Sequence, residues 1–279
     1  MRMSLFVALS LVLVNPALCQ YHPVGLRKLN DDERVEYVKK GIFTTEKTVY
    51  KDSLGVEFTD PNSLSLNLFL DFYVDDQGEI VECVSRKKTS EDIVLRKRII
   101  DTAQEKDWGT VELLKLNCKE SSSMLEDVFN QDQANRKSGG PLNMDIERKN
   151  LAIVLSIIEY CGFPEKKVVG DTGMTAVFLV FQHSTRKVRE KYLPKIMECA
   201  KNGDLSMSEV ALMEDRLLME NGEKQKFGTQ IVKDRKKGIW IVYPIEDPKH
   251  VNIRRASIGL QPIEKYLEQW KIIFDPLAN

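Results

Sequence analysis

The stretch that decides the fold of the first half of the chain is residues 65–85, SLNLFLDFYVDDQGEIVECVS. Apolar residues alternate with the other residues from 65 to 72, and a period of two is typical of a half-buried β-strand. Residues 75–78, Asp-Asp-Gln-Gly, have the composition of a tight turn that closes hairpins. Alternation then returns over residues 79–85. We therefore predict a hairpin of two antiparallel strands.

The residues on either side of this hairpin extend the prediction to a small domain. Leu95, Ile99 and Ala103 recur at four-residue intervals, which is the spacing of a helix face. Residues 110–116, TVELLKL, alternate again and predict a third strand. Residues 47–118 are thus predicted to form a small α+β domain. Residues 20–46 are polar and poorly patterned, and we predict a tether or a short helix there.

The second half of the chain has helical rather than alternating patterns. Residues 121–141 contain a serine run and a Lys-Ser-Gly-Gly-Pro loop signal, and they predict a boundary with a short helical stretch. Residues 125–272 are then predicted to form a mainly helical domain with a carboxy-terminal β-hairpin, which makes the fold class α+β. The predicted elements are helices at 145–161, 174–181, 187–201 and 206–220, strands at 227–232 and 239–243, a helical turn at 252–257 and a last helix from Pro262.

The composition excludes some classes of protein. The 279 residues include 41 Lys and Arg against 42 Asp and Glu, so the net charge is −1. A nucleic-acid-binding protein is expected to carry a basic excess or a basic stripe. We therefore expect no nucleic-acid partner.

The first nineteen residues have the pattern of a secretory signal peptide. Arg2 precedes an apolar run from Leu5 to Val14, Pro16 follows, and Ala17-Leu18-Cys19 places small residues before a cleavage site at Gln20. The run is shorter than the roughly 20 apolar residues that a membrane-spanning helix needs. We expect an exported protein, periplasmic or extracellular, with no transmembrane segment once residues 1–19 are removed. Lipid anchoring at Cys19 is the alternative.

Four cysteines remain after residue 19. An exported protein permits disulfides, and four cysteines allow three pairings that the sequence does not distinguish. Buried free thiols are an equal alternative. The wide spacing excludes a Cys-x-x-Cys metal site, and we expect neither a metal nor another cofactor. The four are Cys83, Cys118, Cys161 and Cys199.

Polar residues that interrupt apolar helices mark a candidate site. His183 follows the apolar run at 174–181, and Asp215 and Arg216 interrupt the apolar helix at 206–220. Buried charges need partners, so we expect these side chains to meet inside the domain. His183 and Asp215 are the candidate catalytic pair. The candidate ligand-binding residues are Asp132, Gln133, Arg136, Gln182, Arg216, Gln225, Thr229, Gln230 and Arg255.

The order of these residues resembles a bacterial family catalogued as domain of unknown function 6624, over residues of about 125–270. The features that carry the resemblance are Asp132-Gln133-x-x-Arg136, Asn150-Leu151, Gly162-x-Pro164, Val169-Gly170, Gln182-His183, Asp215-Arg216, Gln225-x-x-Gly228-Thr229-Gln230, Arg255, Gly259-Leu260 and Pro262. The resemblance implies no activity. Two departures concern the site: Phe227 stands where the family usually has tyrosine, and residues 184–187 replace an acidic stretch.

Residues 68–108 resemble, more weakly, the carboxy-terminal domain of the TonB energy-transducer family. The shared pattern is a strand, an Asp-x-x-Gly-x-Ile turn, a second strand, a helix and a closing Trp108. In that family the domain is a binding module. The resemblance therefore implies a protein partner for the amino-terminal domain.

Three functional hypotheses follow. The first is a binding protein whose polar cleft around His183, Asp215 and Arg216 recognises a small ligand or a peptide. The second is a hydrolase in which Asp215 orients His183 as the general base and Arg136 or Arg216 holds an anionic group. The third is a polar network that only fixes helix packing. A His183 sealed from any pocket would exclude the second.

Overall fold

The structure is a computed structural model that describes residues 20–61, 64–137, 141–234 and 238–277. The chain folds as α+β, with a small sheet followed by a helical body and a second pair of strands, as predicted. The amino-terminal elements are β1 (Arg27–Lys28), α1 (Asp31–Lys40), β2 (Val49–Lys51), β3 (Leu68–Val74), β4 (Ile80–Lys87) and α2 (Ser90–Trp108). The helical elements of the body are η2 (Cys118–Glu120), α3 (Ser121–Lys137), α4 (Met144–Cys161), α5 (Lys166–His183), α6 (Arg186–Lys201) and α7 (Met207–Glu220).

The predicted hairpin is the centre of the amino-terminal sheet. Its strand order is β1-β3-β4-β2, with β3 antiparallel to β4 and β2 parallel to β4. In the turn, Asp75 Oδ1 accepts hydrogen bonds from the backbone N–H groups of Gln77 and Glu79. Gly78 follows with a φ of +78°, a conformation that favours glycine. The turn chemistry read from the sequence therefore fixes the register of β3 and β4.

Of the two alternatives predicted for residues 20–46, the short helix is present as α1 and the tether is not, because the segment also contributes β1 to the sheet domain. β1 pairs with β3, and α1 packs against α2. A capping box starts α1: Asn30 Oδ1 accepts from the N–H of Glu33, and the Glu33 carboxylate accepts from the N–H of Asn30. These short polar elements become ordered by packing on residues distant in the sequence.

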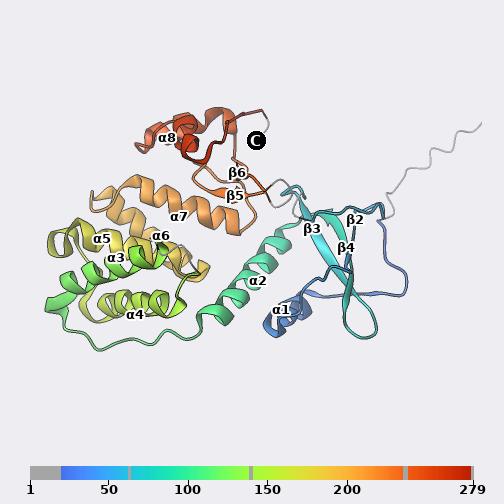
Figure 1. Ribbon diagram of the computed structural model, residues 1–279, viewed down its shortest axis with the longest axis horizontal. Coiled ribbons are helices and arrows are strands. Elements are labelled where there is room, and N and C mark those ends of the chain that lie inside the picture. The colour runs from blue at the N-terminus through green and yellow to red at the C-terminus, as the bar shows by residue number, and fades with distance from the viewer. Residues whose placement is uncertain (1–19, 62–63, 138–140, 235–237, 278–279) are drawn as a thin grey trace, which may run out of the picture.

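Helix α2 lies between the sheet and the helical body (Figure 1). It packs against α1 on one side and against α6 on the other. The helix predicted at 91–103 is therefore confirmed and extends five residues further, to Trp108, whose side chain is buried in the core of the body.

The third strand predicted at 110–116 is absent, because residues 109–117 have no strand partner in the described structure. The segment is an extended connection that runs against α4, where the N–H of Leu114 donates to Ser156 Oγ. Val111 and Leu116 pack partly on the core of the body, whereas Leu113 and Leu114 are exposed, so the alternation does not mark a buried sheet face here.

One disulfide, between Cys118 and Cys161, joins the end of this connection to the end of α4. Cys83 and Cys199 are buried free thiols. The sequence did not distinguish disulfide-bonded from free cysteines, and the structure contains both: one disulfide and two free thiols.

The body is a bundle of α3 to α7 around one large apolar core. Leu125 from α3, Ile157 from α4, Met174 and Phe181 from α5, and Ile196 from α6 are all buried in it. Residues 121–141 were predicted as a boundary with a short helical stretch. Instead α3 runs for 17 residues and is a central element of the core. The run at 174–181 is part of the longer α5.

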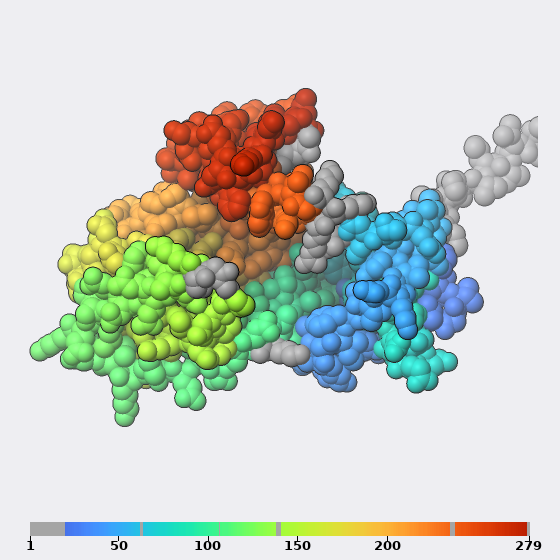
Figure 2. Space-filling view, viewed as in Figure 1, coloured from blue at the N-terminus to red at the C-terminus, as the bar shows by residue number. Residues whose placement is uncertain are grey.

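The carboxy-terminal elements lie over α7 (Figures 1 and 2). They are β5 (Ile231–Lys233), β6 (Trp240–Val242), η3 (Pro248–His250), α8 (Val251–Ser257), α9 (Ile263–Leu267) and η4 (Glu268–Trp270). β5 and β6 form the predicted antiparallel hairpin, and α8 and α9 confirm the last two predicted helices. Val242, Ile245, Val251, Ile263 and Leu267 make a separate small core. In the parts of the chain that are described, no helix combines the length and hydrophobicity needed to cross a membrane.

Candidate functional site

His183, the last residue of α5, forms a pair with a carboxylate from α3. Its Nδ1 lies 2.8 Å from Asp132 Oδ1. The Asp132 side chain is buried, whereas the His183 side chain is 17% exposed. The other ring nitrogen, Nε2, makes no hydrogen bond within the described residues and is not among their fully buried unpaired atoms. The Nδ1 edge of the His183 ring is therefore bonded to Asp132, whereas the Nε2 edge has no partner in the described structure.

Asp132 accepts two further hydrogen bonds. Arg136 Nε donates to its Oδ1 at 3.2 Å and Gln133 Nε2 donates to its Oδ2 at 3.1 Å. Burial raises the pKa of Asp132, but the contacts with His183, Arg136 and Gln133 outweigh burial and lower the pKa overall. Because the carboxylate is ionised, Nδ1 carries the proton of a neutral His183 ring, and Nε2 presents its lone pair.

Arg136 is shared between two carboxylates. Its Nη2 donates to Glu147 Oε2 on α4 at 2.8 Å, in addition to the contact with Asp132. Asn135 Nδ2 donates to the other oxygen of Glu147. Glu147 thereby fixes the guanidinium beside the histidine pair.

Arg216 of α7 is a poorly neutralised cation. Its Nε lies 3.8 Å from Glu220 Oε1, beyond hydrogen-bond distance, and that oxygen already accepts from Arg189. Arg216 makes no hydrogen bond anywhere in the described residues, although its side chain is only 34% exposed. Burial, followed by repulsion from Arg189 and Arg136, lowers the pKa of Arg216 to about 10. Three guanidinium groups therefore lie close together at this end of α5.

Asp215 does not contact His183, so the predicted catalytic pair is wrong. Its carboxylate is fully buried and faces the loop after α7. It accepts from the backbone N–H groups of Lys226, Phe227 and Thr229, and from Thr229 Oγ1. Burial raises the pKa of Asp215 despite these bonds. Helical spacing explains the error, since Asp215 and Arg216 are adjacent in the sequence and point about 100° apart.

The loop that follows α7 is held by its own polar side chains. Gln225 Nε2 donates to the carbonyls of Gln230 and Tyr243, and Gln225 Oε1 accepts from the N–H of Gln230. Gly228 has a φ of +71°, and a Cβ there would lie 2.5 Å from Ile263 Cδ1. The side chains of Gln225 and Thr229 thus make their hydrogen bonds to the loop itself and to Asp215.

Two glutamines connect this loop to the histidine. Gln182 Nε2 and Gln230 Nε2 both approach the carbonyl of Leu212, at 3.4 and 3.3 Å. Gln182 Oε1 is buried without a partner. The two side chains thus join the end of α5 and the loop after α7 to the same carbonyl of α7.

Arg255 is placed away from the histidine. Its Nε donates to the carbonyl of Gln261 and its Nη1 to the carbonyl of Phe227, and its guanidinium lies over the ring of Tyr266. The side chain is buried and ties α8 to the loop after α7.

The structure adds three residues that the sequence analysis missed: Glu147, Arg189 and Glu220. Glu147 lies four residues before the apolar Leu151, on the buried stripe of α4. Arg189 is completely buried, and it donates to the carbonyls of Gln182 and Ser184 at the end of α5. A charge on an apolar helix stripe was the available signal for Glu147 and Arg189.

The assembled site consists of His183 and Arg136 on the shared Asp132 carboxylate, with the charge of Arg216 near that of Arg136. It can accept a proton at His183 Nε2 and hold an anion at Arg136 and Arg216. Across the described residues, no three His, Cys, Asp or Glu side chains are grouped so that they could hold a metal ion.

Comparison with known proteins identifies one part of the chain. Residues 142–274 match the model of a family of unknown function, DUF6624. No curated protein and no solved structure matches the chain. The likeness of residues 68–108 to the TonB domain therefore stays a prediction. The match begins after α3, so that Asp132, Gln133 and Arg136 precede it while His183 and Arg216 lie inside it. The chain is therefore similar, over residues 142–274, to the family of unknown function DUF6624.

Proposed function

We propose that this protein binds a small anionic ligand at the cluster of His183, Arg136 and Arg216. The observation that carries the proposal is the state of Arg216. This guanidinium is two-thirds buried, has two arginines nearby and makes no hydrogen bond within the described residues. A buried cation is stable only when a counter-charge and hydrogen-bond acceptors compensate it.

An oxyanion would supply both kinds of compensation. A carboxylate or phosphate accepts two parallel hydrogen bonds from a guanidinium, and such charge-assisted bonds are stronger than neutral ones. Arg189 and Arg136 already have carboxylate partners in Glu220 and Glu147. Arg216 is therefore the cation available for a ligand, with the open edge of His183 as a second contact.

Binding of simple anions tests this proposal. Inorganic phosphate and succinate would be titrated calorimetrically into the wild-type protein and into Arg216→Gln. Because a charge-assisted hydrogen bond contributes about 1.5–3 kcal/mol, we expect the variant to bind at least about tenfold more weakly.

Arg148→Gln is the matched control, because Arg148 has the same side-chain exposure of 34% but is bonded to Asp145 on the surface of α4. Its affinity for both anions should equal that of the wild type. If neither anion binds the wild type, or if Arg216→Gln binds as well as the wild type does, the proposal is wrong.

A second candidate function, general-base hydrolysis, is favoured by the histidine pair. Asp132 holds Nδ1, and Nε2 is left without a partner in the described structure. This is the arrangement in which a carboxylate orients a histidine that takes a proton from the attacking group. No hydroxyl or thiol of the described residues bonds to His183, so the proton donor would be a water molecule that attacks the substrate.

Chromogenic esters test the second candidate. Hydrolysis of p-nitrophenyl acetate and p-nitrophenyl phosphate would be followed for the wild type, for His183→Ala and for His250→Ala. His250 is a matched control, since its Nδ1 contacts Asp247 at 2.7 Å on an exposed surface. Loss of turnover in His183→Ala alone supports catalysis. Equal rates in all three proteins exclude it for these substrates.

We also propose that the protein acts outside the cytoplasm. The pattern of residues 1–19 supports export, and the Cys118–Cys161 disulfide is suited to an oxidising compartment. Fractionation of bacteria that express the full chain, followed by mass measurement, tests the proposal. A shorter, oxidised protein outside the cytoplasm is expected, and a full-length, reduced protein in the cytoplasm contradicts it.

A further inference from the structure

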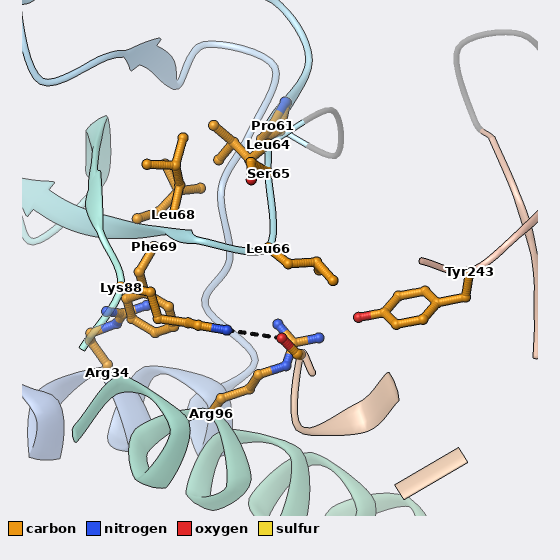
Figure 3. A pocket seen from close by; sticks show the side chains of 12 residues that line it. Arg34, Pro61, Leu64, Ser65, Leu66, Leu68, Phe69, Lys88, Arg96 and Tyr243 are labelled. Carbon is orange, nitrogen blue, oxygen red and sulfur yellow. Dashed lines mark hydrogen bonds between the residues drawn. The ribbon is translucent and has the colours of Figure 1, made fainter. Parts of the chain in front are cut away.

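A cavity of about 450 Å³ lies between the amino-terminal sheet, α1, α2 and the end of α7. It is separate from the cluster around His183, none of whose residues lines it. Its volume is within the range of about 300–1,000 Å³ that is usual for ligand pockets. Figure 3 shows its two unlike sides, a basic side formed by Arg34, Lys88 and Arg96 and an apolar side formed by Leu64, Leu66 and Leu68.

Arg34 is the unusual residue of this cavity. It is 7% exposed, and its guanidinium lies 4.8 Å from the ring centre of Phe69 and 4.5 Å from that of Phe72. Its side chain makes no hydrogen bond within the described residues, and its Nε is fully buried without a partner. Burial lowers the pKa of Arg34, although Asp71 is the largest of several charges that oppose this. The rings alone satisfy none of its N–H donors.

Two more cations face the same space and also lack a carboxylate. Lys88 Nζ donates to the carbonyl of Gly222 at 2.9 Å, and Arg96 Nε donates to the carbonyl of Glu220 at 2.7 Å (Figure 3). Neither forms an ion pair in the described structure, and no acidic residue lines the cavity. The terminal nitrogens of Arg96 make no hydrogen bond in the described structure and can therefore donate to a ligand.

Three carboxylates act on the charge of Arg34, and the two that are buried, Asp71 and Asp92, are paired with other cations. Asp71 accepts from Lys28 and Arg86, and Asp92 accepts from both ends of the Arg86 guanidinium. The third, Asp31, is exposed at the start of α1 and forms no ion pair with Arg34. Arg34 therefore makes no ion pair with a carboxylate in the described structure. A buried guanidinium without a hydrogen-bonded acceptor is unfavourable, and an oxyanion that enters the cavity would relieve that cost.

The opposite side of the cavity selects a ligand with an apolar part. Leu64, Leu66 and Leu68 offer no hydrogen-bonding side chain. In Figure 3, Leu66 lies beside Arg96 and Tyr243, whereas Leu64 and Leu68 lie across β3 from Arg34 and Lys88. Tyr243 completes the wall with its hydroxyl directed into the cavity, where its one contact, to the carbonyl of Met219, is 3.5 Å long. The phenol is thus available as a further donor to an anion.

We propose that this cavity binds an amphiphilic oxyanion, with a carboxylate or phosphate head on Arg34, Lys88 and Arg96 and an apolar tail on the leucine side. The site is distinct from the proposed anion site at Arg216. Arg216→Gln therefore leaves binding at this cavity unchanged, and the two proposals succeed or fail separately.

Titration with four probes tests the proposal. Decanoate and decyl phosphate carry both parts, decanol carries only the tail, and inorganic phosphate carries only the head. Each is titrated calorimetrically, below its micelle concentration, into the Arg216→Gln variant, in which the other proposed anion site is removed. One-to-one binding of decanoate or decyl phosphate is expected, at least tenfold tighter than binding of decanol or phosphate. The tighter of the two amphiphiles identifies the head group.

Substitution of Arg34 locates the binding. Arg34→Met removes the charge and keeps an unbranched apolar side chain against Phe69 and Phe72, so the protein should fold with an unchanged or raised melting temperature. We expect at least tenfold weaker binding of the amphiphile. Arg98→Met is the matched control, because Arg98 is on α2 but pairs with Asp32 outside the cavity.

Arg96→Met is the second variant, needed if Arg34→Met does not fold, and it too should bind at least tenfold more weakly. Three results would overturn the proposal: no binding of either amphiphile, equal binding of decanol, or wild-type affinity in the folded variants.

Discussion

Asp215 and Asp132 are both buried carboxylates, but their donors differ in kind. Asp215 accepts from backbone N–H groups of the loop after α7, whereas Asp132 accepts from the side chains of His183, Arg136 and Gln133. Backbone donors cannot leave, so Asp215 fixes the loop. Side-chain donors can exchange partners, so the contacts of Asp132 are compatible with the proposed anion site.

The role of Asp215 predicts a large loss of stability in Asp215→Asn. An asparagine amide offers one acceptor oxygen, and its NH₂ group would face the N–H groups of Phe227 or Thr229. Each buried donor left unpaired costs about 1–3 kcal/mol, so we expect a loss of roughly 2–4 kcal/mol in urea unfolding. Glu214→Gln, which removes a partly exposed pair with Lys226, should cost less than about 1 kcal/mol. Equal losses would mean that the loop bonds are not what stabilises this region.

Asp132 predicts a dependence of stability on pH. Its folded pKa is lowered below the unfolded value of about 3.9. Its contribution is therefore complete above about pH 4 and is lost as the pH falls through the folded pKa. The difference in unfolding free energy between wild type and Asp132→Asn should shrink from pH 7 to pH 3. Asp127→Asn, on the exposed side of α3, should differ from wild type equally at both pH values.

Single residues show what the sequence could and could not predict. The polar residues that interrupt apolar helices were identified correctly as buried or half-buried, because a charge on an apolar stripe is visible in one helix. Their partners were not predictable. The pairing of His183 with Asp132 instead of Asp215 depends on how α3 crosses α5, and that crossing is a property of the packed core.

Among the elements, those with a strong local signal were predicted and those without one were not. The β3–β4 hairpin, α6 and α7 each have periodicity together with a turn or a cap, such as the capping box of Ser206 and Glu209. Helix α1 and β1 are short and polar, and they are ordered by α2 and β3. The connection at 110–116 has the opposite property, since it alternates like a strand but lies on α4.

The disulfide makes this connection a structural element, and its removal should be measurable. Cys118 and Cys161 are 43 residues apart, and a loop of that length corresponds to about 4 kcal/mol in the chain-entropy treatment. We expect reduction by dithiothreitol to lower the melting temperature of the wild type. In the Cys118→Ser/Cys161→Ser double variant, the same treatment should change nothing. A wild type that is insensitive to complete reduction would contradict this account.

In the whole molecule, α2 and the residue before it attach the amino-terminal half to the helical body through polar contacts with α7 and α6. Arg96 and Lys88 bind the end of α7. The stretch 184–187, where this chain departs from the pattern of the family that it resembles, contacts α2. The backbone N–H of Arg186 donates to Gln104, and its side chain binds Asp101. The departure thus coincides with the contact that attaches the amino-terminal half.

Arg186 should therefore control whether the two halves unfold together. Its side chain is 4% exposed and makes two hydrogen bonds to Asp101, at 2.8 and 2.7 Å, with a third to Glu190. Breaking a buried pair by removing one partner costs about 3–5 kcal/mol. We expect Arg186→Met to lower the melting temperature and to split one calorimetric transition into two, because α2 loses its attachment to α6. Lys187→Met is the matched control: Lys187 is the next residue and pairs with Glu105 on the same helix, but that pair is exposed and should be worth less than about 1 kcal/mol. A single transition in Arg186→Met, shifted no further than in Lys187→Met, would mean that apolar packing of α2 alone holds the halves together.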